Sequence, residues 1–227
     1  MKLSFMKGSG WGKRLIFYDL DGTLVDTRED ISQAANHMRA QLGMGPLSRE
    51  EICSYVGFGL RQLVQNCLQT EDAQRTEQGL SIYRSFYREH LLDHTALYPG
   101  VREVLDYFRG RLQAVVTNKP NPASRQILQA LGVADYFMEI LGGDDGYPKK
   151  PDPAGLRAIL DRSKVEPHQA LLVGDSPIDI QTGTRAGVAT VVVAQGFSPR
   201  EELVAAKPEE FVEDFPQLLK LARQRAW

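Results

Sequence analysis

The chain has 227 residues, enough for one α/β domain or for a domain with an inserted subdomain. Its formal net charge of -2, without a block of basic residues, argues against a nucleic-acid partner. No apolar run is long enough to span a membrane, and the N-terminal segment lacks the continuous apolar stretch of a signal peptide. Cys53 and Cys67 fit no metal-ligand spacing and are interpreted as reduced thiols that pack between helices. We therefore expect a cytoplasmic protein that binds neither nucleic acid nor membrane.

The first predicted strand, residues 15–18, is apolar and ends at two carboxylates, Asp19 and Asp21. Side chains two positions apart on a strand project to the same side, so the two carboxylates point toward one place. Like charges held together need compensation, which a divalent cation with oxygen ligands supplies. A turn or a helix N-cap is the alternative interpretation, because Asp and Gly are ordinary turn residues. The apolar strand before the pair and the helical pattern after Thr27 favour the metal site.

A block of helical pattern follows this strand. Helices are predicted over residues 28–42, from the capping-box sequence at 48–51, over 60–68 and over 71–90. The last of these carries an apolar and aromatic face made of Leu80, Tyr83, Phe86, Tyr87 and Leu91. We interpret this face as core or interdomain packing and not as a cofactor site.

From Tyr98 onward the pattern alternates between strand and helix. Strands are predicted at 112–116, 138–141, 170–173 and 190–193, with helices at 101–109, 123–131, 154–162 and 178–186. The tail adds a short strand near Phe211 and a closing helix. Such alternation implies parallel pairing, so the predicted fold is α/β, a Rossmann-like doubly wound parallel sheet. We expect a core domain of residues 1–26 and 98–227, interrupted by a helical subdomain of residues 27–97.

Polar side chains follow four of the predicted strands. These are Asp19 and Asp21; Thr117, Asn118 and Lys119; Asp144 and Asp145 with Lys150; and Asp175 with Asp179. Taken singly, each has an ordinary explanation as a helix cap or a solvated loop residue. Ligands of open α/β sheets bind outside the carboxyl ends of the strands, so the joint placement indicates one site.

In this order and spacing, the four segments resemble the four motifs of the haloacid dehalogenase-like (HAD) superfamily of Mg²⁺-dependent phosphatases. The matching residues are Asp19-Leu20-Asp21-Gly22-Thr23, Thr117, Lys150, and Gly174-Asp175 with Asp179. The inserted helices resemble the α-helical cap of that superfamily. Within it the chain is most similar to the phosphoglycolate phosphatases, through Gly59-Leu60-Arg61, Tyr98-Pro99-Gly100-Val101, Val116-Thr117-Asn118-Lys119, Gly142-Gly143-Asp144-Asp145, Lys150-Pro151-Asp152-Pro153 and Gly174-Asp175-Ser176.

The resemblance implies a different part for each acidic residue. Asp19 is expected to be the nucleophile and to form an aspartyl-phosphate. Asp21 is expected to protonate the leaving group and then to deprotonate the attacking water, which argues for phosphoryl chemistry and against dehalogenation. The expected Mg²⁺ ligands are Asp19, the backbone carbonyl of Asp21, and Asp175. Asp179 is expected to support the metal waters or to orient Lys150.

The remaining motif residues are expected to hold the phosphoryl oxygens. They are Thr117, Asn118, Lys150 and the backbone N–H groups near Gly22, where a side chain would obstruct close approach.

The cap is expected to select the substrate, with Arg61 as the receptor for a carboxylate and the amides near Gly57 and Gly59 assisting. A solvated helix arginine is the equally open alternative for Arg61. The resemblance implies that the substrate is a small phosphorylated metabolite, and first of all 2-phosphoglycolate, which the related phosphatases convert to glycolate and phosphate. The protein is expected to be a monomer or a homodimer. Alternatives are a phosphatase for a sugar phosphate, pyrophosphate or nucleotide, a sugar phosphomutase, and a catalytically silent binding protein.

Overall fold

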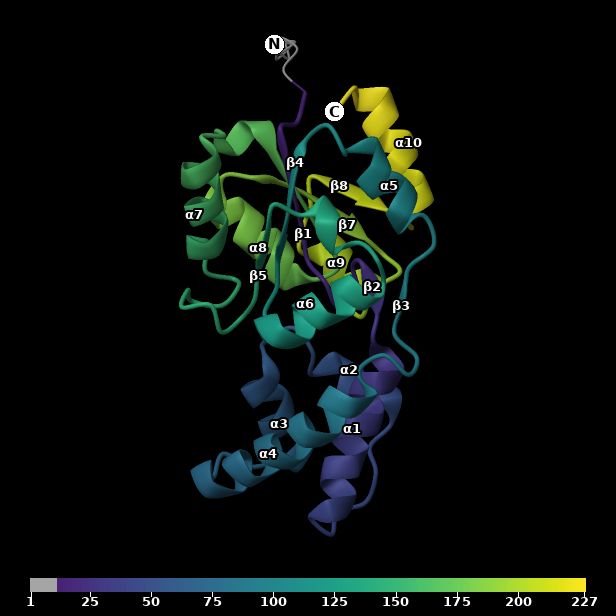
Figure 1. The fold of residues 1–227 in the computed structure, drawn as a ribbon, viewed down its shortest axis with the longest axis vertical. Coiled ribbons are helices and arrows are strands. Elements are labelled where there is room, and N and C mark those ends of the chain that lie inside the picture. The colour runs from purple at the N-terminus through teal and green to yellow at the C-terminus, as the bar shows by residue number, and fades with distance from the viewer. Residues whose placement is uncertain (1–11) are drawn as a thin grey trace.

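The computed structural model describes residues 12–227, and its centre is a six-stranded parallel sheet (Figure 1). The strands are β1 (Leu15–Tyr18), β4 (Leu112–Val116), β5 (Glu139–Leu141), β6 (Ala170–Gly174), β7 (Ala189–Val193) and β8 (Glu210–Val212). Their order across the sheet is β5-β4-β1-β6-β7-β8, and every neighbouring pair is parallel. The predicted α/β doubly wound fold is confirmed.

Helices cover both faces of this sheet. They are α5 (Val101–Tyr107), α6 (Asn121–Ala130), α7 (Ala154–Ser163), α8 (Pro177–Ala186), α9 (Arg200–Ala205) and α10 (Phe215–Arg225). Ile16 and Tyr18 of β1 belong to the apolar cluster that includes residues of α5, α6 and α10, whereas Leu15 and Phe17 belong to the cluster with α7. Because β1 is buried on both faces, its sequence is a continuous apolar run and not an alternating one.

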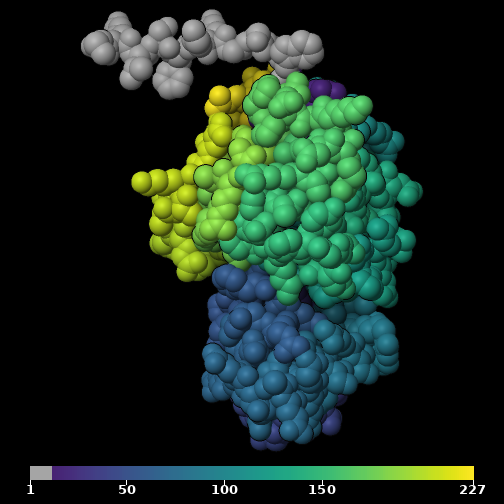
Figure 2. All heavy atoms as spheres, turned by 90° about the vertical axis from the view of Figure 1, so that its left-hand side faces the viewer, coloured from purple at the N-terminus to yellow at the C-terminus, as the bar shows by residue number. Residues whose placement is uncertain are grey.

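Four helices form a second lobe at one end of the sheet (Figures 1 and 2). They are α1 (Arg28–Gln41), α2 (Arg49–Ser54), α3 (Leu60–Leu68) and α4 (Ala73–His90). Ser48 caps α2 by accepting a hydrogen bond from the N–H of Glu51 at 3.1 Å. Cys53 and Cys67 are free and buried, which confirms the interpretation of both as packing thiols.

Two short strands join this lobe to the sheet. β2 (Val25–Asp26) and β3 (Ala96–Leu97) pair antiparallel, and the sequence did not predict them because two residues show no periodicity. The carboxylate of Asp30, at the start of α1, accepts hydrogen bonds from the N–H of His94 at 3.0 Å and from the N–H and Oγ1 of Thr95 at 2.9 and 2.7 Å. We propose that the boundary between core and cap lies at this pair of connections.

Some element boundaries differ from the predicted ones. The helix expected from residue 123 begins at Asn121, because Pro122 is accommodated in the first turn, where its missing N–H costs nothing. Helix α9 was not predicted. It has six residues after Pro199, too few to show an apolar period. Across residues 12–227, every helix is either too short or too polar to cross a lipid bilayer.

The course of the chain defines where a ligand binds. From β1 at the centre, the chain moves outward through β4 to β5 and then returns to the other side of β1 at β6. The connections that follow β1 and β4 run toward β5, whereas the connection that follows β6 runs the other way, toward β7. Such a reversal opens a crevice at the carboxyl edge of the sheet. The cap helices face this edge (Figure 1).

Candidate active site

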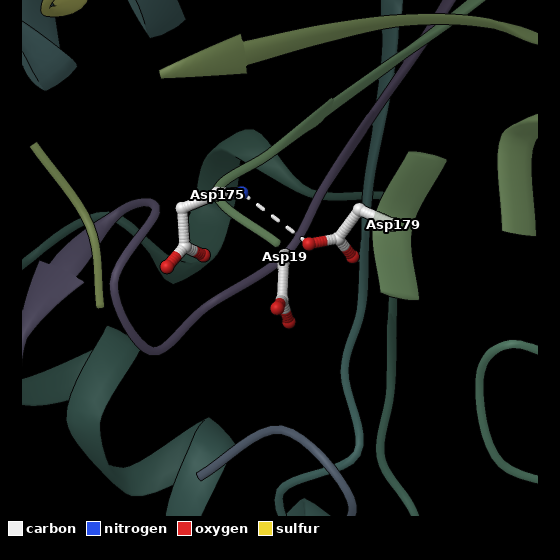
Figure 3. A group of neighbouring side chains, drawn as sticks. All are labelled: Asp19, Asp175 and Asp179. Atoms are coloured by element: carbon white, nitrogen blue, oxygen red, sulfur yellow. Dashed lines mark hydrogen bonds between the residues drawn. The ribbon is translucent and has the colours of Figure 1, made fainter. Parts of the chain in front are cut away.

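Three aspartates converge at the carboxyl edge of the sheet. Asp19 follows β1, Asp175 follows β6, and Asp179 lies in the first turn of α8. All three are buried, and one carboxylate oxygen of each lies within 4.8 Å of the others. The carboxylates of Asp19 and Asp175 point to the same side (Figure 3). The convergence arises because Asp19 and Asp175 directly follow the neighbouring parallel strands β1 and β6, which end at the same edge, and because α8 begins beside them.

Two loops hold the Asp175 carboxylate, each through one of its oxygens. Thr23 Oγ1 donates to its Oδ1 at 2.7 Å, and the N–H of Phe197 donates to its Oδ2 at 2.9 Å. Gly22 and Gly196 lie so close that a Cβ at either position would overlap this carboxylate. Gly22 also has a positive φ of 80°, so the first motif needs glycine there for conformation and for space.

Asp179 is occupied by protein donors. It forms a reciprocal capping box with Ser176, and its Oδ2 accepts from Ser176 Oγ at 2.6 Å. Its Oδ1 accepts from Lys150 Nζ at 2.7 Å. Lys150 Nζ also lies 2.9 Å from Asp19 Oδ1, although that oxygen is buried without a well-directed hydrogen bond from any described residue. Asp179 thus holds the Lys150 ammonium through a hydrogen bond, while Asp19 and Asp175 keep oxygen lone pairs free.

Burial dominates the ionisation of this cluster. It raises the pKa of Asp19 to about 6, against the lowering effect of Lys150, with a further increase from Asp179. It raises the pKa of Asp175 to about 8, and the nearby Asp179 and Asp19 carboxylates add to the increase. For Lys150, burial works to lower the pKa, but the two carboxylates outweigh it and the net shift is upward. Three carboxylates with one ammonium leave an excess of negative charge.

This excess of buried negative charge fits a divalent cation, and among the described residues Asp19 Oδ1 has the Lys150 ammonium beside it but no well-directed hydrogen bond. Hard cations take carboxylate and carbonyl oxygens as ligands and offset the repulsion between such groups. The cluster is thus a buried acidic group able to hold a divalent metal ion.

The Asp21 carboxylate is not part of this cluster, although the strand period predicted that Asp19 and Asp21 point toward one place. The prediction fails because β1 ends at Tyr18 and the chain turns at Leu20, so Asp21 has a different set of partners. Its Oδ1 accepts from Thr27 Oγ1 at 2.7 Å, and both carboxylate oxygens accept from Lys119 Nζ, at 3.0 and 3.1 Å. The same ammonium donates to the hydroxyl of Tyr87 at 2.7 Å. The sequence placed Lys119 among the strand-end residues of the site but assigned it no role. The available signal was its place directly after Thr117 and Asn118, at a strand end.

The residues expected to bind phosphate have distinct surroundings. Thr117 is buried, lines the cavity described below, and accepts through Oγ1 from the N–H of Lys119 at 3.3 Å, which leaves its hydroxyl hydrogen available. The N–H of Gly22 donates to the carbonyl of Val25 at 3.0 Å, and those of Thr23 and Leu24 donate to the carbonyl of Leu20 at 3.2 and 2.9 Å, so these bonds do not test the predicted phosphate contact in this turn.

Asn118 uses its amide within the protein. Its Oδ1 accepts from the N–H of Lys150 at 2.8 Å, and its Nδ2 donates to the carbonyl of Lys150 at 2.9 Å and to that of Gly57 at 2.6 Å. These three bonds tie the loop after β4 to the loop that carries Lys150 and to the cap. Asn118 therefore positions two loops, and its predicted phosphate contact is not tested by these bonds.

A cavity of about 600 Å³ lies between the cap and the core. The core contributes Asp19, Asp21, Thr117, Asn118, Lys119 and Lys149, and the cap contributes Gly59, Arg61, Tyr83, Arg84, Tyr87 and Arg88, among others. Arg61 faces this cavity as expected, but its guanidinium also pairs with Glu77. The cationic residues Arg84, Arg88 and Lys149 were missed, because an exposed arginine or lysine has the same sequence pattern whichever surface it faces.

A family model described as haloacid dehalogenase-like hydrolase matches residues 16–193. The chain belongs to this family, and the described geometry agrees with its motif order. A phosphoglycolate phosphatase of Chromobacterium violaceum is 36% identical over 215 residues, covering 91% of this chain and 96% of the relative. One of Vibrio vulnificus is 34% identical, covering 91% and 94%.

Solved structures share the same fold. A crystal structure of a predicted phosphoglycolate phosphatase from Haemophilus somnus superimposes with a TM-score of 0.88 at 30% sequence identity, covering 92% of this chain and 97% of that chain. The coverage includes the cap as well as the sheet. The predicted HAD-like architecture is therefore confirmed for nearly the whole length.

Proposed function

We propose that this protein is a Mg²⁺-dependent phosphatase that hydrolyses 2-phosphoglycolate to glycolate and phosphate. The observation that carries the proposal is the Asp19 carboxylate, which lies beside Lys150 and Asp175 and lines the cavity between cap and core. The phosphoglycolate phosphatases that the chain matches over 91% of its length support the choice of substrate. Two buried free thiols accord with a reducing, cytoplasmic setting.

Charge is the main physical obstacle to this reaction. A phosphate dianion must approach the anionic Asp19, and two unit charges about 4 Å apart repel by about 4 kcal/mol at an effective dielectric constant near 20. Lys150 offsets part of this repulsion, since its ammonium lies 2.9 Å from Asp19. A Mg²⁺ ion held by Asp19, Asp175 and the Asp21 carbonyl would supply positive charge at the phosphoryl oxygens.

The proposed reaction has two displacement steps. Asp19 attacks phosphorus, the ester P–O bond breaks, and the leaving oxygen takes the proton from Asp21. Water then attacks phosphorus and gives a proton to Asp21, and the bond from phosphorus to Asp19 breaks. Phosphate leaves, and both aspartates return to their starting states. The Thr117 hydroxyl and the Lys150 ammonium stabilise the charge that develops on the transferring group.

The cap side of the cavity carries positive charges that can bind the carboxylate of a substrate. Arg61, Arg84 and Arg88 all line it, and a guanidinium binds a carboxylate through two hydrogen bonds. Arg61 remains our candidate for this contact, with the amides near Gly59 beside it. We also propose that the cap excludes water when it lies on the core, as in other enzymes that close over their substrates.

The direct test is phosphate release from a panel of phosphomonoesters, with Mg²⁺ and with EDTA. Asp19→Asn should abolish turnover, whereas Asp161→Asn, an exposed aspartate of α7, should leave it unchanged. Turnover in EDTA, or an Asp19→Asn variant with normal activity, would refute the mechanism. Preference for a sugar phosphate, pyrophosphate or nucleotide would change the substrate, and isomerised sugar phosphate without free phosphate would identify a mutase.

A further inference from the structure

We propose that Tyr87 of the cap is a positioning residue which, through Lys119, fixes the Asp21 carboxylate for proton transfer. The proposal rests on the function proposed above. It adds that the proton-transfer part of the reaction depends on the contact between cap and core. Neither Tyr87 nor Lys119 touches the reacting phosphorus in this scheme; both act through Asp21.

The geometry is a chain of hydrogen bonds that starts in the cap. Tyr87 lies in α4, and its hydroxyl accepts from Lys119 Nζ at 2.7 Å. That ammonium donates to the two oxygens of Asp21 at 3.0 and 3.1 Å. The side chains of Lys119 and Asp21 are only 6% and 10% exposed, so water has little access to the pair. Burial raises the pKa of Tyr87 well above its usual value, and its hydroxyl stays neutral.

Three acceptors match the three donors of one ammonium group. Two of them are the oxygens of Asp21, and the third is the hydroxyl of Tyr87. Lysine has a long, flexible side chain, so a fixed third partner removes much of its freedom to rotate away. Without the hydroxyl, a buried donor is left unsatisfied and the ammonium moves toward another acceptor. Asp21 then loses the partner that holds both of its oxygens, and among residues 12–227 the side chain of Thr27 alone still donates to its carboxylate.

The loop after β4 carries both contacts to the cap. Asn118 Nδ2 donates to the carbonyl of Gly57 at 2.6 Å, and Lys119 donates to Tyr87. On the face shown in the space-filling view, the cap and the core meet along one boundary (Figure 2). If the cap moves away from the core, both hydrogen bonds break together. Asp21 is thus fully positioned only while the cap covers the cavity and excludes water.

The test compares Tyr87→Phe with Tyr55→Phe. Both variants remove one cap hydroxyl that forms a hydrogen bond, but the Tyr55 hydroxyl bonds to Glu51, within the cap. We expect Tyr87→Phe to lower kcat for 2-phosphoglycolate about tenfold, a fraction of what general acid–base catalysis contributes. KM should stay within about twofold, because the Tyr87 hydroxyl is bonded to Lys119 and phenylalanine keeps the rest of the side chain in the cavity wall. Tyr55→Phe should leave both constants unchanged.

Leaving-group dependence separates positioning of a proton donor from a general structural defect. In single-turnover experiments with p-nitrophenyl phosphate, the leaving phenolate needs no proton, so Tyr87→Phe should release it as fast as the wild type. Lys119→Met combined with Tyr87→Phe should be no slower than Lys119→Met alone, because Tyr87 acts through Lys119.

The proposal is overturned by a rise in KM with unchanged kcat, by an equal loss of rate with the aryl ester, or by additive losses in the double variant. A wild-type protein that hydrolyses no phosphomonoester would overturn the proposed function and this inference together. An active wild type with a fully active Tyr87→Phe variant would overturn this inference alone.

Discussion

Two glycines pack closely against the Asp175 carboxylate, and replacing them tests how much this site depends on close packing there. Gly22 has a φ of 80°, and a Cβ there would overlap Asp175. Gly196 lies against the same carboxylate but is not among the residues with positive φ. Gly43, at the end of α1, has a φ of 72° and no atom within 4 Å of a built Cβ. Alanine at the three positions therefore separates backbone strain from crowding of the carboxylate.

The expected losses of unfolding free energy follow from these two effects. Gly43→Ala should cost about 1–2 kcal/mol, the price of a left-handed conformation for an L-residue. Gly196→Ala should cost about 1–3 kcal/mol, because an extra carbon in a packed site displaces its neighbour. Gly22→Ala combines both effects and should cost about 2–5 kcal/mol. Urea unfolding, with a comparison of midpoints and slopes, measures all three.

Metal binding distinguishes the crowded positions from the open one. Gly22→Ala and Gly196→Ala displace the Asp175 carboxylate, so both should reduce the increase in Tm that Mg²⁺ produces. Gly43→Ala should keep the full increase, because Gly43 lies outside the site. An equal metal response in all three variants would refute the assignment of Asp175 as a metal ligand. A Gly43→Ala variant as unstable as Gly22→Ala would refute the crowding argument.

Two further predictions concern pH and substrate recognition. Burial raises the pKa of Asp175 to about 8, above its value in the unfolded chain, so the metal-free protein loses stability as pH rises toward 8. At about pH 6 a proton competes with the metal for this carboxylate, so the increase in Tm produced by Mg²⁺ should be larger at about pH 8.5. Thermal shift assays measure this increase, and an equal increase at both pH values would contradict the prediction. Arg61→Gln should raise KM for 2-phosphoglycolate about tenfold and leave KM for an ester without a carboxylate unchanged. A normal KM in Arg61→Gln, with a raised one in Arg84→Gln, would move the carboxylate receptor to α4.

The acidic cluster could be predicted because it depends on regular geometry. Asp19 and Asp175 each follow an apolar strand, and parallel strands end at the same edge of a sheet. The alternation of strands and helices predicts parallel pairing, and parallel pairing places both residues at that edge without reference to any particular packing arrangement. The roles of these residues needed the family resemblance, because two converging carboxylates alone are compatible with several chemistries.

The contacts between cap and core could not be predicted in the same way. The helical period of α4 places Tyr87 on an inward face, but it does not say which part of the core that face meets. The Tyr87–Lys119 bond joins the inserted segment to a core residue 32 positions further along the chain. The pairing of Arg61 with Glu77 likewise depends on how α3 packs against α4. Such contacts follow from the docking of whole elements and not from local pattern.

The hydrogen bonds divide the site into a part built by the core and a part completed by the cap. Among the described residues, the carboxylates of Asp175 and Asp179 accept only from core residues, whereas Lys119 and Asn118 reach the cap. The metal cluster should therefore form whether or not the cap is closed. Tyr87→Phe should lower kcat and leave the Mg²⁺-induced increase in Tm unchanged. A smaller Mg²⁺-induced increase in Tm in Tyr87→Phe would contradict this division of the site. It would show that the cap also shapes the acidic cluster, although no hydrogen bond among the described residues joins Tyr87 to Asp175 or Asp179.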